Sequence, residues 1–136
     1  MEELTFGLNE RGLPSPEAEV RAQEIARRYD ASELLKLATH ELSAGQKTLV
    51  CILTVLIDQP KTLLLDESFS HLDLRTSRHM TRMVKDCPAQ IVLSTHQTPL
   101  LQDFDEIIWL EQGKVQMQGS PGDVLKAYQD WGEGRC

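Results

Sequence analysis

Two short apolar runs, each followed by side chains that can bind a ligand, constrain the fold of this chain most. Residues 62–65 lead into Asp66 and Glu67, and residues 90–95 lead into His96. Each run lies between turn signals, and a segment with a helical pattern separates the two. Continuous apolar runs in this setting are typical of buried parallel strands. Because helices and strands alternate along the chain, we predict an α/β fold with a parallel sheet.

The other segments carry helix, turn or hairpin patterns. We expect helices over residues 15–29, 31–37, 44–58, 73–85, 99–103 and 122–131, and a hairpin of residues 106–110 and 114–117. In the first helix Val20, Ile25 and Ala26 lie on the expected apolar side, and Asp30 is the expected N-cap of the second. Residues 49–57 are apolar nearly all round, which predicts a buried helix.

Length, charge and cysteine content exclude several classes of function. The 136 residues fit one domain with a real core. The net charge of −7 argues against a nucleic-acid partner, because phosphate binding needs a basic surface. Cys51, Cys87 and Cys136 show no C-x-x-C pattern, which favours a reduced setting without disulfides or structural zinc. The longest apolar run is far shorter than the roughly 20 residues that span a bilayer.

Ser43-Ala44-Gly45-Gln46 opens the third predicted helix. The spacing of Ser43 and Gln46 predicts a capping box. A helix N-terminus also binds anions through its unbonded amides, and Gly45 would let a ligand approach the backbone closely. Taken alone, this segment is more simply interpreted as a helix cap than as a binding site.

The side chains at the strand ends suggest phosphate chemistry, because ligands bind beyond the carboxyl ends of strands in open α/β sheets. Asp66 could hold a magnesium ion through water, and Glu67 could activate a water for attack on a phosphate. His96, at the end of the next strand, could contact the same phosphate. The alternative interpretation of the two acids is a turn or helix cap.

Four short motifs occur in one order: LSAGQ at 42–46, TLLLDE at 62–67, SHLD at 70–73 and STH at 94–96. With 23 residues from Ser43 to Asp66 and 30 from Asp66 to His96, they resemble the signature, Walker B, D-loop and H-loop of ABC transporter ATPase subunits. The opening EELTFGLNERGLP and the later GSPGDVLK resemble ATPases of the energy-coupling-factor kind, which serve cobalt, nickel and vitamin uptake.

The resemblance implies one partial ATPase domain over residues 1–136, with an incomplete P-loop NTPase (RecA-like) parallel sheet. Residues 7–40 would form the helical subdomain that meets a membrane partner. Residues 41–136 would carry the signature helix, Walker B, D-loop, H-loop and a C-terminal hairpin and helix. The implied partners are a second ATPase subunit, identical or not, and a transmembrane transporter subunit, at the cytoplasmic face of the cell membrane.

The family's residue roles carry over to matching positions. Ser43, Ala44, Gly45 and Gln46 would bind the γ-phosphate of ATP held by the opposite subunit, Asp66 would support Mg²⁺, Glu67 would activate the attacking water, His96 would sense the γ-phosphate, and Asp73 would lie at the dimer interface. The implied cofactors are therefore ATP and Mg²⁺.

The chain also departs from this pattern. No G-x-x-x-x-G-K-[ST] occurs in the sequence, so the Walker A phosphate loop is absent, and with it the strand that carries the loop. We expect a gap between strands 90–95 and 106–111, with exposed apolar edges. Ala44 stands where glycine is usual, Thr48 and Leu49 replace a polar pair, and Ser68 replaces a proline.

Two hypotheses follow. In the first, the chain is part of an ATP-hydrolysing subunit of an ABC importer for a metal ion or vitamin, and alone it hydrolyses no ATP. In the second, it is a non-catalytic module that donates its signature motif in trans to a complete ATPase subunit. A chromosome-maintenance or DNA-repair ATPase shares these motifs, but the chain is acidic and has no sustained heptads.

Overall fold

The computed structural model describes residues 2–10 and 12–134. The chain divides into two compact units, Met1–Thr95 and His96–Cys136, and each is described by itself. Cys51 and Cys87 carry free thiols, and the third cysteine, Cys136, lies outside the described residues.

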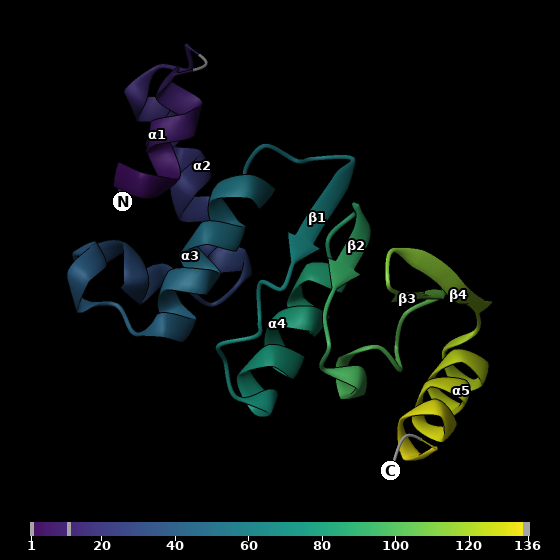
Figure 1. The fold of residues 1–136 in the computed structure, drawn as a ribbon. Helices are drawn as coiled ribbons and strands as arrows, with labels where there is room; N and C mark the ends of the chain where they lie inside the picture. The colour runs from purple at the N-terminus through teal and green to yellow at the C-terminus, as the bar shows by residue number, and fades with distance from the viewer. Residues whose placement is uncertain (1, 11, 135–136) are drawn as a thin grey trace. The chain divides into compact units, whose positions relative to one another are not determined.

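Helices make up the N-terminal part of the first unit (Figure 1). They are α1 (Glu2–Glu10), α2 (Ser15–Arg28), the 3₁₀ turns η1 (Ser32–Lys36) and η2 (Thr39–Glu41), and α3 (Ala44–Leu56). Three alanines at four-residue spacing, Ala18, Ala22 and Ala26, form the buried side of α2. Because alanine is small, this stripe lets neighbouring helices approach closely. The alanines belong to one core cluster with Leu4 of α1 and Leu53 of α3.

The alanine stripe corrects one sequence-based expectation for α2. Val20 was expected on the apolar side, but its side chain is 54% exposed. Ala26 is fully buried as expected, and Ile25 packs at the edge of the cluster. The size of the Val20 side chain does not predict its burial, because the residues of α2 that are buried are its alanines.

Two local predictions near the N-terminus are corrected as well. The segment after Tyr29 forms a 3₁₀ turn rather than an α-helix, with Ala31 at its N-cap position and no side-chain cap. Asp30 instead adopts a left-handed backbone with φ 53°, a conformation that Asp tolerates better than most residues. Helix α1 forms where no regular element was expected.

Helix α3 begins where the capping box predicted, but it is not buried all round. Ile52, Leu53 and Leu56 are buried, whereas Val55 is 44% exposed and Cys51 is exposed. The prediction of a fully buried helix is therefore wrong, because part of the surface of α3, including Cys51 and Val55, faces solvent.

A parallel strand pair follows α3, as predicted. β1 (Thr62–Asp66) pairs with β2 (Gln90–Ser94), with Leu64 opposite Val92 in the register, and α4 (Leu74–Lys85) lies between them in sequence. Leu63 and Leu65 are buried, but Leu64 is 72% exposed and Val92 is 49% exposed. The strands are thus covered on one face only, which corrects the expectation that both faces would be buried.

The second unit contains η3 (Thr98–Leu100), β3 (Ile107–Glu111), β4 (Lys114–Gly119) and α5 (Pro121–Glu133). β3 and β4 form the predicted antiparallel hairpin, turning at Gln112 and Gly113, which both have positive φ. Trp109 of β3 contacts the rings of Tyr128 and Trp131 on α5 edge-on.

The described residues form two separate two-stranded sheets, one parallel and one antiparallel. The mixed α/β class and the parallel pairing predicted from the sequence are confirmed. None of the helices that the structure describes has the length and apolar character needed to cross a membrane.

Candidate functional site

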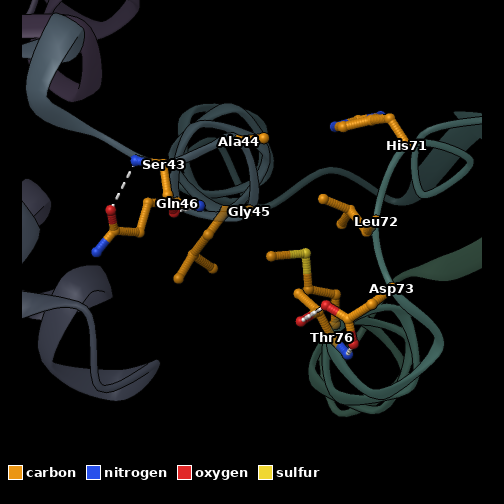
Figure 2. Close-up of a pocket in the computed structure, with 10 residues that line it drawn as sticks. Ser43, Ala44, Gly45, Gln46, His71, Leu72, Asp73 and Thr76 are labelled. Carbon is orange, nitrogen blue, oxygen red and sulfur yellow. Dashed lines mark hydrogen bonds between the residues drawn. The ribbon is translucent and has the colours of Figure 1, made fainter.

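A groove of about 440 Å³ lies in the first unit, between the N-terminal turn of α3 and the loop that leads into α4. Figure 2 shows Ser43 to Gln46 on one side and His71 to Asp73 with Thr76 on the other. Its lining residues are Ser43, Ala44, Gly45, Gln46, Leu49, His71, Leu72, Asp73, Thr76 and Met80. The groove therefore brings the segment of the predicted signature motif together with that of the predicted D-loop.

A reciprocal cap fixes the α3 side of the groove. The backbone N–H of Gln46 donates to Ser43 Oγ at 3.3 Å, and the N–H of Ser43 donates to Gln46 Oε1 at 2.8 Å. This is the capping box predicted from the sequence. The bond in which Gln46 serves as acceptor is drawn in Figure 2. Both side chains are thereby held at the mouth of the helix, where its dipole favours a negative ligand.

A second cap fixes the α4 side. Asp73 Oδ1 accepts a 3.0 Å bond from the N–H of Thr76, and Oδ2 accepts a 2.6 Å bond from the Thr76 hydroxyl. The hydrogen bond from the Thr76 side chain is the main reason that the pKa of Asp73 lies below its ordinary value. Asp73, predicted at a dimer interface, is thus the N-cap of α4 in this chain; its interface role stays a prediction.

The two sides approach each other closely at Gly45. A Cβ atom at this position would lie 3.4 Å from Thr76 Cγ2 and 4.0 Å from Leu72 Cδ2. A larger side chain here would press against the first turn of α4. The glycine therefore matters for packing within the groove as well as for access to the α3 amides.

A polar contact also joins the two sides. Thr48 Oγ1 lies 2.9 Å from His71 Nε2, and Thr48 Oγ1 donates to the carbonyl oxygen of Ala44 at 3.2 Å. Sequence reasoning assigned no role to His71. The available signal was its place beside Leu72-Asp73 in SHLD, but its partner is 23 residues away, so no local pattern predicts the contact.

The two acids stand at the carboxyl end of β1. Glu67 has a left-handed backbone with φ 47°, and its N–H donates to the Ser94 carbonyl oxygen at 3.0 Å. The Glu67 carbonyl oxygen accepts from Ser70 Oγ at 2.8 Å. Hydrogen bonding to β2 thus continues one residue past the end of β1, and the chain then turns sharply at Glu67. Among the described residues that line the groove, neither Asp66 nor Glu67 is included.

Asp66 is compatible with the magnesium role that the resemblance implies. Its side chain is exposed at the end of β1, where it could meet a hydrated ion. In the described part of the chain, no three His, Cys, Asp or Glu side chains gather closely enough to hold a metal ion by themselves. Mg²⁺ suits such a site, since it keeps most of its water and takes one or two carboxylates together with substrate phosphates.

His96 is the first residue of the second unit and is described with that unit alone. Its carbonyl oxygen accepts a 3.1 Å bond from the N–H of Thr98 at the start of η3. It follows β2 after one intervening residue, because the strand ends at Ser94 rather than at residue 95 as expected. The predicted roles of His96, Asp66, Glu67 and the groove residues toward a nucleotide stay predictions.

Comparisons with known proteins find a matching family and homologous ATP-binding proteins. A family model described as "AAA domain, putative AbiEii toxin, Type IV TA system" matches residues 2–103. The "Biotin transport ATP-binding protein BioM" of Rhodobacter capsulatus is 34% identical over 93% of this chain and 54% of its own length. A "Putative ABC transporter ATP-binding protein" of Deinococcus radiodurans is 34% identical over 95% of this chain and 57% of its own length.

A solved structure extends the similarity to the fold. The cbiO1 protein of Clostridium perfringens, titled as part of the ABC transporter complex cbiONQ, matches with a TM-score of 0.80 and 30% identity. The match covers 90% of this chain and 51% of that protein. The chain spans about half the length of the relatives that it matches. From the family match over residues 2–103, the chain belongs to the AAA-domain family, and over about half of their length it is similar to ATP-binding proteins of ABC transporters.

Proposed function

We propose that the chain contributes to the ATPase of an ABC importer for a vitamin or metal ion, and that alone it hydrolyses no ATP. In this proposal Ser43 to Gln46 contact the γ-phosphate of ATP held by another subunit. Asp66 supports Mg²⁺, Glu67 activates the attacking water, and His96 senses the γ-phosphate. Magnesium, when bound, would neutralise charge on the phosphates.

The groove between α3 and α4 is the observation that carries the proposal. Ser43 and Gln46 are held by their reciprocal cap, and Gly45 leaves room between the two helices. Amides in the first turn of a helix have no acceptor within the helix. The Gln46 amide donates to Ser43 Oγ, so we propose that the Ala44 and Gly45 amides bind the phosphate oxygen. This side of a nucleotide site is built from the chain's own residues.

A nucleotide site also needs a loop that surrounds the phosphates, and the motif for such a loop does not occur among the 136 residues. No G-x-x-x-x-G-K-[ST] occurs, and that loop supplies the backbone amides and the lysine that surround the phosphates. We therefore propose that Asp66 and Glu67 act only where another polypeptide segment supplies the phosphate loop.

The name of one relative supports the substrate class, since it is called a biotin transport protein. On this basis, and from the resemblance of two sequence segments to ATPases of the energy-coupling-factor kind, we propose a vitamin or metal ion as the cargo. We also propose that residues 7–40 meet a transmembrane subunit, which would place the chain at the cytoplasmic face of the membrane.

The second candidate function is a non-catalytic module that donates Ser43 to Gln46 in trans to a complete ATPase subunit. It is favoured by the same groove, which needs no residue beyond Met80. The two candidates differ in whether Glu67 and His96 ever act on a nucleotide.

Two measurements test the proposal. Isothermal titration of the purified chain with Mg-ATP should give no micromolar binding, and a phosphate-release assay should give no turnover. Micromolar affinity would contradict the proposal. Next, the chain is mixed with a complete homologous subunit. We expect wild-type chain to change turnover and Ser43→Arg to have no effect. Glu67→Gln is tested in the same assay. If this substitution also reduces the effect of the chain on turnover, the catalytic candidate is favoured over the module.

A further inference from the structure

The contact between Thr48 and His71 joins two segments that lie far apart in sequence. Thr48 follows the first turn of α3, and His71 lies two residues before the cap of α4. Their side chains meet at 2.9 Å, between Oγ1 and Nε2. In Figure 2 His71 lies on the loop opposite the N-terminal turn of α3.

The hydrogen atoms in this contact can be assigned by counting. A threonine hydroxyl has one hydrogen to donate, and Thr48 Oγ1 directs it to the Ala44 carbonyl oxygen at 3.2 Å. The two contacts form at the same time only if Thr48 Oγ1 accepts at the 2.9 Å contact and His71 donates from Nε2. If Thr48 instead donated to Nε2, the hydrogen bond to the Ala44 carbonyl oxygen would be lost.

The glycine in α3 leaves space in front of the same loop. Leu72 Cδ2 lies 4.0 Å from where a Cβ on Gly45 would be, so the helix offers no side chain for the loop to pack against at this point. The contact between Thr48 and His71 is therefore the one that holds the loop against the helix across this space.

From these contacts we infer that His71 is a positioning residue. Its Nε2–H holds the loop of residues 70–73 against α3, so that Ser43 to Gln46 and Asp73 face the same ligand. The inference rests on the proposed function, because it concerns how that groove is presented to a partner's nucleotide. His71 acts through Thr48 and is not assigned a contact with the phosphates.

The first test reads the tautomer directly. Long-range ¹H–¹⁵N NMR of the ring nitrogens at pH 8 should show His71 with its hydrogen on Nε2. Because a free neutral imidazole also prefers this tautomer, the discriminating signal is slow exchange of the Nε2–H with water, which Thr48→Val should lose. His79, an exposed histidine on α4, is the internal control and should be the same in both spectra. A hydrogen on Nδ1 in the wild-type chain would overturn the inference.

The second test measures the role in turnover, with the complete homologous subunit described above. His71→Ala and Thr48→Val should each raise the half-maximal concentration of the chain about twofold to tenfold, the usual effect of losing one such hydrogen bond. The double variant should be no worse than either single variant. His71→Gln, which places an amide N–H where Nε2 was, should restore the wild-type value, and His79→Ala should match wild type.

The outcomes separate the two claims. A wild-type chain without any effect on turnover overturns the proposed function, and the role of His71 fails with it. A wild-type chain that acts, while the two single substitutions add in the double variant, overturns the inference alone. Circular dichroism of each variant verifies that it folds. If His71→Ala does not fold, Thr48→Val and His71→Gln still test the inference.

Discussion

The hydroxyl of Thr76 donates a 2.6 Å hydrogen bond to Asp73, while the methyl carbon of Thr76 lies 3.4 Å from where a Cβ on Gly45 would be. One threonine therefore links the charge that caps α4 to the packing against α3. A change in the protonation of Asp73 and a change in volume at Gly45 act on the same side chain.

The lowered pKa of Asp73 predicts how stability depends on pH. The Thr76 hydroxyl stabilises the ionised carboxylate, so its folded-state pKa lies below the ordinary value of 3.8. Such a group stabilises the fold at pH above 3.8 and loses this contribution as the pH falls through the folded-state pKa. In urea unfolding above pH 3.8, wild type should be more stable than Asp73→Asn. The difference in unfolding free energy should shrink as the pH is lowered.

Thr76→Val is the control for this cause. It keeps the shape of the side chain but removes the hydroxyl donor, so the pKa of Asp73 should rise toward its ordinary value in an NMR titration. An unchanged pKa would show that the side-chain hydrogen bond is not the main cause.

The close approach at Gly45 predicts that volume is poorly tolerated there. Gly45→Val should destabilise the first unit by about 1–3 kcal/mol in chemical unfolding, the usual effect of overpacking. Gly122 is a matched control, because it occupies the same second position in α5 and a Cβ there would meet nothing within 4 Å. Gly122→Val should stay within about 0.5 kcal/mol of wild type, as is usual for exposed positions. Equal effects of valine at both positions would contradict the packing argument.

The reciprocal cap predicts a local effect of removing the Ser43 hydroxyl. Ser43→Ala should destabilise the start of α3 by about 1 kcal/mol, and the Gln46 amide should exchange its hydrogen faster because it loses its acceptor. Ser43→Asn keeps a capping side chain and should exchange like wild type. Amide hydrogen exchange followed by NMR gives this result residue by residue; unchanged exchange in Ser43→Ala would disprove the cap.

Adjacent leucines in β1 predict opposite outcomes for the same substitution. Leu65 is 5% exposed, so Leu65→Ala should cost about 2–5 kcal/mol of unfolding free energy. Leu64 is 72% exposed, and Leu64→Ala should stay within about 0.5 kcal/mol of wild type. Urea unfolding of the two variants tests the one-sided burial of the strand; similar losses would contradict it.

Local signals account for the features that the sequence predicted well. α3 begins directly after Ser43, because the Ser43 side chain accepts a hydrogen bond from the N–H of Gln46. The hairpin turn needs only residues such as Gly113 that adopt a positive φ. Parallel pairing of the two strands followed from apolar runs with an intervening helix. These signals depend on neighbours within a few residues, so a single sequence contains them.

Burial and long-range contacts were predicted less well. Leu64 and Val20 are apolar residues whose burial depends on whether another segment covers them, and the local pattern carries no such information. Ala18 and Ala22 were missed because small residues give a weak hydrophobic signal. His71 was missed because its partner is distant in sequence. The predicted signature and D-loop segments were each recognised, but the groove that they share depends on tertiary packing.

The one-sided burial of the parallel strand pair also affects colloidal behaviour. Leu64 and Val92 lie opposite each other in the register and present adjacent apolar surface to water. At neutral pH the net charge of −7 keeps copies of the chain apart. Added salt shortens the range of that repulsion to about 10 Å at 0.1 M. Solubility of the isolated chain is therefore set by a balance between its overall acidity and two exposed side chains on neighbouring strands.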